Sequence, residues 1–198
     1  MYYGPTQNMT AEEWEHLLAI NLHAPIHFIR LLLPVLLKLP HAQIVNVASM
    51  FGLVGTCKSA AYTASKFALV GLSESLRAEY GRFGLGVMAV CPGFVETSLF
   101  VAGISGERDG RMPRPPRWVC TTPERVAQKV ISGIYRNRAV VLITPLAYLL
   151  NYVKRLAPWL LDWMRHWNLR QPRPGPDKQQ EKLELEPRGS EPKRTEAL

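Results

Sequence analysis

The chain has 198 residues, 47% of them hydrophobic, so it is not wholly disordered and is long enough for one domain with a hydrophobic core. Its net charge of +8 comes from 24 Lys and Arg against 16 Asp and Glu, but no known module or aromatic-interleaved basic patch indicates nucleic-acid binding. Three cysteines exclude a scaffold built on disulfides. They lack metal-ligand spacing, so we expect no metal site and interpret them as small, buried apolar residues.

Helical and strand-like patterns alternate along the chain, which predicts an α/β fold with a parallel sheet. A capping box at Thr10 and Glu13 begins a helix, which Pro25 is expected to bend and Pro40 to end. A β-branched run over residues 43–48 predicts a buried strand. The order continues with a helix over 61–83 that Gly84 ends, a strand over 86–91, a helix over 123–136 that Thr122 caps, and a strand over 139–143.

Residues 98–120 hold three glycines and three prolines without a clear period, which predicts a mobile loop over a site. Four arginines recur there at every third position and would align along one edge of a polyproline II stretch, although a solvated loop is the simpler explanation. They are Arg108, Arg111, Arg114 and Arg117. We expect one ordered unit over residues 1–168.

Residues 169–198 are expected to form a disordered, charged, proline-rich tail. From residue 171 onward the sequence holds six basic and six acidic residues, five prolines and almost no large apolar residues. Such a composition buries too little surface to offset its ordering entropy. The charges of this tail cancel, so residues 1–170, with eighteen basic and ten acidic side chains, carry the whole net charge.

An amphipathic terminal helix is predicted over residues 145–168. At 100° per residue its aromatic side chains fall within roughly a 100° arc, beside an aliphatic stripe and close to basic residues. The aromatic residues are Tyr148, Tyr152, Trp159, Trp163 and Trp167, and the basic ones are Lys154, Arg155, Arg165 and Arg170. This pattern is typical of a helix that lies in a membrane interface. The alternative is a helix packed on its own domain or on a second subunit of a homo-oligomer.

No apolar run reaches the roughly 18 residues of a membrane span, the nearest being 139–153, and residues 1–10 lack the pattern of a signal peptide. An odd number of cysteines without an export signal favours a reducing compartment. We therefore expect a cytoplasmic protein, with peripheral membrane contact through residues 145–168 as the alternative.

Ser49, Tyr62 and Lys66 form the constellation that carries chemistry. Tyr62 and Lys66 are four residues apart on one predicted helix, so both side chains project from the same face, and Ser49 follows a predicted parallel strand at the edge where α/β sheets place ligands. A tyrosine has an ordinary pKa of about 10, and a neighbouring ammonium is expected to lower it. Ser49 can hydrogen-bond a carbonyl oxygen. By spacing alone, a half-buried tyrosine, a solvated lysine and a strand-end serine explain these residues as well.

Four motifs in register decide between these interpretations. They are Asn21 in Trp14-x6-Asn21-Leu22, Ser49 in Ile44-Val-Asn-Val-Ala-Ser49, the run Tyr62-Thr-Ala-Ser-Lys66, and the run Cys91-Pro-Gly-Phe-Val-Glu-Thr97. Together they resemble the short-chain dehydrogenase/reductase family over residues 10–97; beyond Thr97 the resemblance is loose. It implies a three-layer Rossmann-type fold with a parallel sheet.

The resemblance also implies a role for each residue. Tyr62 would be the general acid/base, Lys66 would lower its pKa and bind the nicotinamide ribose, Ser49 would hold the substrate oxygen, and Asn21 would bind a relay water where its helix opens locally. Four further residues would contact the nicotinamide half of the cofactor. They are Pro92, Gly93, Val95 and Thr97, and for Thr97 a plain helix cap is an equal alternative.

The family's glycine-rich T-G-x-x-x-G-x-G loop and its N-N-A-G segment do not occur in this sequence. We therefore expect an N-terminally truncated fold without the first βαβαβ part, and weak binding of NAD or NADP by this chain alone. Two interpretations stay open: the chain is part of a longer, ordinary enzyme, or the short chain is complete and lacks a stable cofactor site.

The function implied by the resemblance is NAD(P)-dependent transfer of hydride between the cofactor and a carbonyl or alcohol carbon. The candidates for substrate contact suggest an apolar alcohol or ketone; they are Phe51, Leu53, Val54, Phe94, the loop 98–118 and Trp118. The alternative function is a cofactor-deficient, non-catalytic protein that contacts a membrane or a partner.

Overall fold

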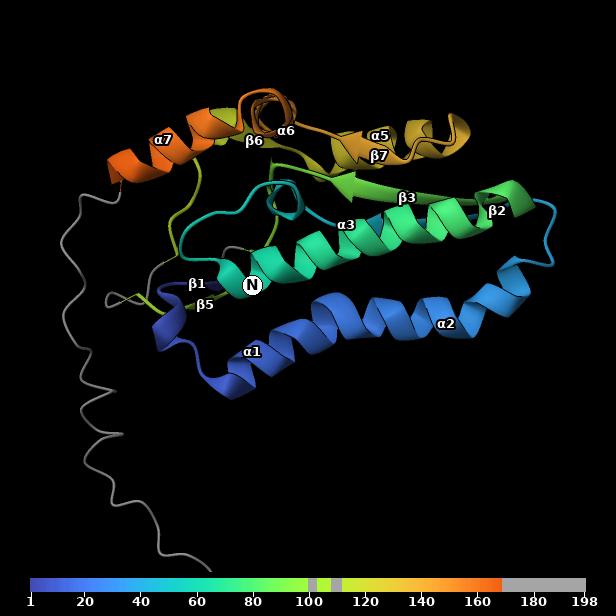
Figure 1. The fold of residues 1–198 in the computed structure, drawn as a ribbon, viewed down its shortest axis with the longest axis horizontal. Coiled ribbons are helices and arrows are strands. Elements are labelled where there is room, and N and C mark those ends of the chain that lie inside the picture. The colour runs from blue at the N-terminus through green and yellow to red at the C-terminus, as the bar shows by residue number, and fades with distance from the viewer. Residues whose placement is uncertain (100–102, 108–111, 169–198) are drawn as a thin grey trace, which may run out of the picture.

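A parallel three-stranded sheet lies at the centre of the computed structural model, which describes residues 1–99, 103–107 and 112–168 (Figure 1). Its strands are β2 (Ala42–Val47), β3 (Leu85–Cys91) and β7 (Val140–Leu142), in the order β2-β3-β7. The register pairs Ala42 with Leu85 and Ala89 with Val140. The predicted strands and their parallel arrangement are thus confirmed, with ends within one or two residues.

Helices cover both faces of this sheet. On one face lie α2 (Ala24–Leu36) and α3 (Ala60–Tyr80), and on the other lies α5 (Pro123–Tyr135) (Figure 1). All seven residues of β3 are buried, and their side chains alternate between the two faces. Val87 packs with residues of α2 and α3, whereas Met88 packs against α5. The result is the three-layer, Rossmann-type arrangement that the resemblance implied.

The first helix begins at the predicted capping box. Thr10 Oγ1 accepts the Glu13 N–H at 3.1 Å, and the Thr10 N–H donates to Glu13 Oε2 at 2.9 Å. Three segments follow one another without a break: α1 (Ala11–Leu18), a π-helical segment η2 (Ala19–His23) and α2. The extra residue per turn in η2 is the local opening expected around Asn21.

This continuous helix, Ala11–Leu36, is a candidate span that the search for uninterrupted apolar runs did not indicate. It is 26 residues long, and an 18-residue window in it reaches a mean hydropathy of 1.4, so by length and composition it passes as a span. Its inner side packs on α3. Along its length it exposes five large apolar residues, namely Ile20, Phe28, Leu31, Leu32 and Val35.

The ends of α3 are fixed by local signals. A 3-10 turn, η4 (Gly81–Phe83), follows it, and Gly84 then adopts a left-handed φ of +85°, which glycine reaches without strain. In its middle, the buried Ser73 hydroxyl donates to Leu69 O and accepts from Asn46 Nδ2 at 2.9 Å. This bond satisfies a buried amide on β2 and ties the strand to the helix.

The segment predicted as a mobile loop is partly ordered by two short parallel ladders. One pairs β1 (Tyr2–Tyr3) with β5 (Ile104–Ser105), and the other pairs β4 (Phe94–Val95) with β6 (Cys120–Thr121). The remaining short elements are three 3-10 turns, η1 (Thr6–Asn8), η3 (Met50–Gly52) and η5 (Arg117–Val119). Of the four arginines, Arg114 and Arg117 are exposed, and Arg108 and Arg111 lie outside the described residues.

The prediction of a single terminal helix over 145–168 was wrong, because the structure divides this segment into two helices. α6 (Pro145–Leu156) ends at Ala157, and α7 (Pro158–Asn168) begins at the next residue. Pro158 has no N–H to continue the hydrogen-bond ladder of α6, so the chain turns there. The side chains of Arg165 and Trp167, together with Arg170 and the predicted tail 169–198, lie outside the described part.

Candidate active site

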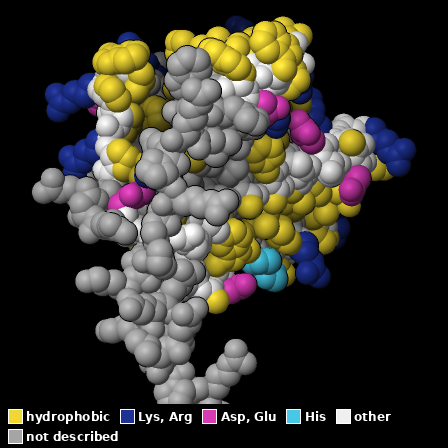
Figure 2. Space-filling model, turned by 60° about the vertical axis from the view of Figure 1, so that its left-hand side comes forward, with side chains coloured by type: hydrophobic (Ala, Val, Ile, Leu, Met, Phe, Trp, Pro, Cys, Tyr) yellow, Lys and Arg dark blue, Asp and Glu magenta, His cyan; other side chains and the backbone are white. Residues whose placement is uncertain are grey.

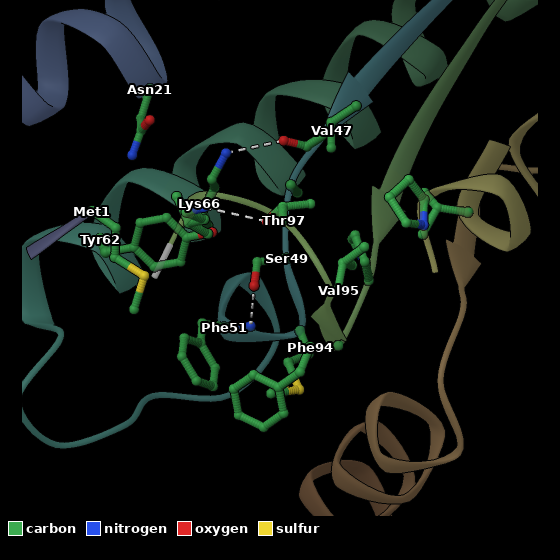
Figure 3. A pocket seen from close by; sticks show the side chains of 17 residues that line it. Met1, Asn21, Val47, Ser49, Phe51, Tyr62, Lys66, Phe94, Val95 and Thr97 are labelled. Atoms are coloured by element: carbon green, nitrogen blue, oxygen red, sulfur yellow. Dashed lines mark hydrogen bonds between the residues drawn. The ribbon is translucent and has the colours of Figure 1, made fainter. Parts of the chain in front are cut away.

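An open pocket of about 370 Å³ lies where β2 and β3 end (Figure 3). All eight residues that the sequence singled out line it, although they come from four separate segments of the chain. They are Asn21, Ser49, Tyr62, Lys66, Pro92, Gly93, Val95 and Thr97. The carboxyl ends of parallel strands meet at one edge of a sheet, which explains how the fold brings these segments together.

Asn21 reaches the pocket from the π-helical segment, and its amide is held by a residue that the sequence analysis missed. Asn21 Nδ2 donates to Ser65 Oγ at 3.2 Å, and Ser65 Oγ donates to the carbonyl oxygen of Tyr62 at 2.7 Å. Ser65 is fully buried. It therefore connects the helix of Asn21 to the first turn of α3, which carries Tyr62. Its place inside the Tyr62–Lys66 motif was the signal available in the sequence.

Tyr62 is buried, with 8% of its surface exposed, and it lies beside Ser49 in the pocket. Burial raises the pKa of the Tyr62 phenol above its ordinary value, and a hydrogen bond with Ser49 opposes this rise. Ser49 Oγ also accepts the Phe51 N–H at 3.2 Å, which fixes the serine at the start of η3 (Figure 3). Tyr62 is thus a protonated phenol at neutral pH, the form that can donate a proton.

The lowering of the Tyr62 pKa by Lys66 stays a prediction, because the two causes that act on this pKa in the structure are burial and the hydrogen bond with Ser49. Lys66 Nζ lies 5.6 Å from the centroid of the Tyr62 ring and donates to Val47 O at 3.0 Å (Figure 3). The net direction of the Tyr62 pKa is upward because burial is its largest cause. Burial also lowers the pKa of Lys66 itself, since a low-dielectric surrounding disfavours the ammonium.

We expect Lys66→Met to leave the melting temperature of the chain unchanged or to raise it. Methionine keeps the length of the side chain and removes a partly buried charge whose desolvation opposes folding. Because the unfolded state retains the Lys66 proton to higher pH, the wild type gains stability as pH rises from the lowered pKa toward the ordinary one. Any advantage of the variant should therefore shrink over that range. Thermal unfolding followed by circular dichroism measures both effects.

Lys38→Met, at an exposed lysine just after α2, is the matched control for this measurement. A fall in the melting temperature of Lys66→Met by more than about 4 °C contradicts the prediction. In a chain of this size, such a fall corresponds to a loss of about 1 kcal/mol or more in the free energy of unfolding.

The turn at Pro92 and Gly93 lines the pocket, and the structure gives Gly93 a reason that the sequence did not show. A Cβ atom placed on Gly93 would lie 2.1 Å from Thr144 Oγ1, so no other residue fits without displacement. Thr144 in turn caps α6, because its hydroxyl accepts the Ala147 N–H. The Met50 N–H donates to Pro92 O at 2.8 Å and ties this turn to the segment of Ser49.

Val95 and Thr97 also line the pocket. Val95 belongs to β4 and pairs with Thr121. The Thr97 hydroxyl is exposed and accepts the Leu99 N–H at 3.4 Å, which agrees with the capping role that the sequence left open for it. The contacts of both residues with a cofactor stay a prediction.

One wall of the pocket is aromatic. The ring of Phe51 stands edge-to-face to Tyr62 at 6.3 Å and to Phe94 at 6.2 Å, measured between centroids. Leu99, from the predicted loop 98–118, also lines the pocket. Among the described residues, the lining further includes apolar side chains that the sequence did not indicate, namely Met1, Val47, Ala48, Met50, Pro123 and Val126. Of the predicted substrate-contact residues, Leu53, Val54 and Trp118 are absent from this lining; Val54 is buried elsewhere and Trp118 borders a different groove.

The expectation that all three cysteines are buried holds for one of them. Cys91 is fully buried, and burial raises the pKa of its thiol to about 12, so it is no nucleophile at neutral pH. Cys57 is exposed and Cys120, in β6, is partly exposed. No cluster of potential metal ligands occurs among the residues that the structure describes.

A comparison with protein families matches the family model described as short chain dehydrogenase over residues 2–106. The chain belongs to the short chain dehydrogenase family. This match covers the α1–α2 helix, β2, α3 and β3, which are the elements that carry the eight pocket residues. It confirms the resemblance inferred from the four motifs.

Relatives within this family are longer than the present chain. It is 28% identical over 147 residues to D-beta-hydroxybutyrate dehydrogenase of Rhizobium meliloti, covering 74% of this chain and 54% of that protein. It is 29% identical over 171 residues to the ketoacyl reductase HetN of a Nostoc species, covering 83% and 57%. The chain thus spans about half the length of these curated relatives.

A solved structure supports the fold. A short-chain dehydrogenase from Sphingobium yanoikuyae, determined in complex with NADPH, superposes with a TM-score of 0.63 at 22% identity and covers 89% of this chain and 63% of that one. At this identity the match shows the shared fold.

Proposed function

We propose that this chain carries the catalytic part of an NAD(P)-dependent oxidoreductase, which transfers hydride between the cofactor and a carbonyl or alcohol carbon. One observation carries the proposal: eight residues from four separate motifs line a single pocket. Membership of the short chain dehydrogenase family, and the NADPH bound by a protein of the same fold, support it.

The donors of this pocket fit the nicotinamide half of such a cofactor. The Lys66 ammonium, the Tyr62 phenol and the Thr97 hydroxyl all border a space whose size lies in the ordinary range of small-molecule sites, about 300–1,000 Å³. Lys66 and Tyr62 would hold the ribose hydroxyls, and the turn at Pro92 and Gly93 with Val95 would lie against the ring. When bound, the cofactor supplies or accepts the hydride.

The protein's own residues handle the proton. Ser49 would donate a hydrogen bond to the substrate oxygen and polarise the carbonyl, while Tyr62 donates its proton to that oxygen as negative charge develops there. The raised pKa of Tyr62 keeps the phenol protonated until this moment. Asn21, held by Ser65 at the opened turn of its helix, would place a water that returns a proton toward Lys66.

An apolar alcohol or ketone is the substrate class that we propose. The aromatic wall of Phe51 and Phe94 continues into a neighbouring space of about 330 Å³, which shares Met1, Phe51 and Phe94 with the main pocket. The far side of that space is formed by residues of the proline-rich stretch from Met112 to Pro116. A bulky apolar substituent would fit there, with its reacting carbon beside Tyr62.

Two measurements test the proposal. In the protein as its gene encodes it, oxidation of NADH or NADPH should depend on an added apolar ketone, followed by the loss of absorbance of the reduced cofactor. In the 198-residue chain alone, calorimetric titration with either cofactor should show feeble binding. If the whole encoded protein turns over no ketone or alcohol, the non-catalytic alternative gains support; tight binding by the 198-residue chain contradicts the expectation of a weak site.

A further inference from the structure

The outer face of α6 and α7 is apolar although it faces solvent. Among the side chains that the structure describes on these helices, six large apolar ones are exposed, and we call them the aromatic face; they are Tyr148, Leu149, Tyr152, Leu156, Trp159 and Trp163. Leu156 is 80% exposed and Trp159 is 69% exposed. Hydrophobic side chains gather along the top of the molecule in Figure 2, the end at which α6 and α7 lie in Figure 1.

This exposure is not the by-product of a loosely packed helix. The opposite side of α6 is in the core: Ala147 is fully buried, and Leu146 and Leu150 pack against the cluster around β3. The Lys154 side chain is exposed, but its ammonium donates to Leu53 O and lies 4.4 Å from the Phe67 ring centroid. This predicted flanking cation is therefore bound to the chain itself, and α6 has two apolar sides.

Positive charge borders the aromatic face. Arg125 and Lys129 lie one turn apart on α5 and line a groove together with Leu149 and the exposed Trp118. Lys129, Arg136 and Arg138 line a second hollow together with Tyr148. No acidic side chain from the described ranges lines either space. The acidic residues of α5 and α7 that lie nearest in sequence to these cations and to the aromatic face are Glu124 and Asp162, and both are exposed.

We propose that the aromatic face docks the protein on the surface of a membrane that contains anionic lipids. Tryptophan and tyrosine favour the interface of a bilayer because each has an apolar ring and a polar group, and an interfacial helix buries such a face to about 5–10 Å. The cations of α5 would lie at the level of the lipid headgroups and attract anionic ones. A second copy of the chain fits less well, because a symmetric contact would bring like charges together around the patch.

Vesicle co-sedimentation of the full chain tests this surface. The wild type should bind vesicles of phosphatidylcholine mixed with phosphatidylserine, bind phosphatidylcholine alone more weakly, and lose binding as salt concentration rises. The double variant Leu156→Ser, Trp159→Ser should bind at least tenfold more weakly, since it removes the two most exposed side chains of the face. Arg125→Gln, Lys129→Gln should weaken binding to the anionic vesicles by about 25-fold and leave binding to the neutral ones unchanged.

Matched controls come from the opposite side of the molecule. Phe28→Ser, Leu31→Ser on α2 replaces one aromatic and one leucine of similar exposure, and Arg30→Gln, Lys38→Gln removes two exposed cations. Neither control should change vesicle binding. The proposal is overturned if the wild type binds no vesicles, or if the α2 variants lose binding as much as the α6–α7 variant. It is overturned as well if the wild type is a dimer that Leu156→Ser, Trp159→Ser converts to a monomer while vesicle binding persists.

Discussion

Tyr62→Phe is expected to lower the turnover of the protein, as its gene encodes it, by about 10²- to 10⁴-fold, the range that general acid–base catalysis contributes. Phenylalanine keeps the ring that packs edge-to-face against Phe51 and removes only the hydroxyl. The proton for the substrate oxygen then has no donor at that position, whereas the shape of the pocket is preserved. Steady-state rates with reduced cofactor and an apolar ketone measure the effect.

Tyr80→Phe is the matched control, because Tyr80 is a partly buried tyrosine at the other end of the same helix, α3. This variant should keep its turnover. The KM for the ketone should change little in Tyr62→Phe, since Ser49 still binds the oxygen. Near-wild-type turnover in Tyr62→Phe would remove Tyr62 from the mechanism, and a parallel loss in Tyr80→Phe would attribute the effect to the helix.

The pH dependence of ketone reduction follows from the same residue. Below the pKa of the Tyr62 phenol the proton is present, and above it the proton is lost. Because burial raises this pKa above its ordinary value, the acid form persists throughout the neutral range. If the rate of ketone reduction falls at high pH because Tyr62 loses its proton, the midpoint of that fall should therefore lie above the ordinary tyrosine pKa of about 10.

The sequence could predict most of the site because the site consists of short motifs. Tyr62 and Lys66 lie on one helical turn, and their relation is set by the period of the helix alone. The fold could be predicted for a similar reason, since β-branched strands and capped helices alternate with clear boundaries at Thr10, Gly84 and Thr122.

What the sequence could not predict depends on contacts between distant segments. The direction of the Tyr62 pKa depends on how deeply the fold buries the ring, and spacing carries no information on burial. The bond from Lys154 to Leu53 O depends on the position of Leu53, and the bond from Asn21 to Ser65 depends on how two helices pack. The break at Pro158 was visible in the sequence, but the continuous apolar pattern around it favoured one helix.

Gly93→Ala is expected to destabilise the chain by about 1–3 kcal/mol, the usual cost of an extra methyl group in a closely packed place. The new Cβ would meet the hydroxyl oxygen of Thr144, which is itself buried at the first turn of α6. Either the turn of Pro92, which lines the pocket, or the start of α6 must move. Chemical denaturation of the chain measures the loss, and turnover of the encoded protein should fall as well.

Gly71→Ala separates this contact from the general effect of replacing glycine. Gly71 lies within α3, and nothing lies within 4 Å of a Cβ built there, so alanine should stabilise the chain by up to about 1 kcal/mol through its higher helix propensity. Thr144→Ala removes the opposing oxygen and costs about 0.5–2 kcal/mol as a lost cap. Because that oxygen is then absent, Gly93→Ala should cost less in the Thr144→Ala background than in the wild type. Additive effects of the two substitutions would show that the steric contact with Thr144 does not select glycine at position 93.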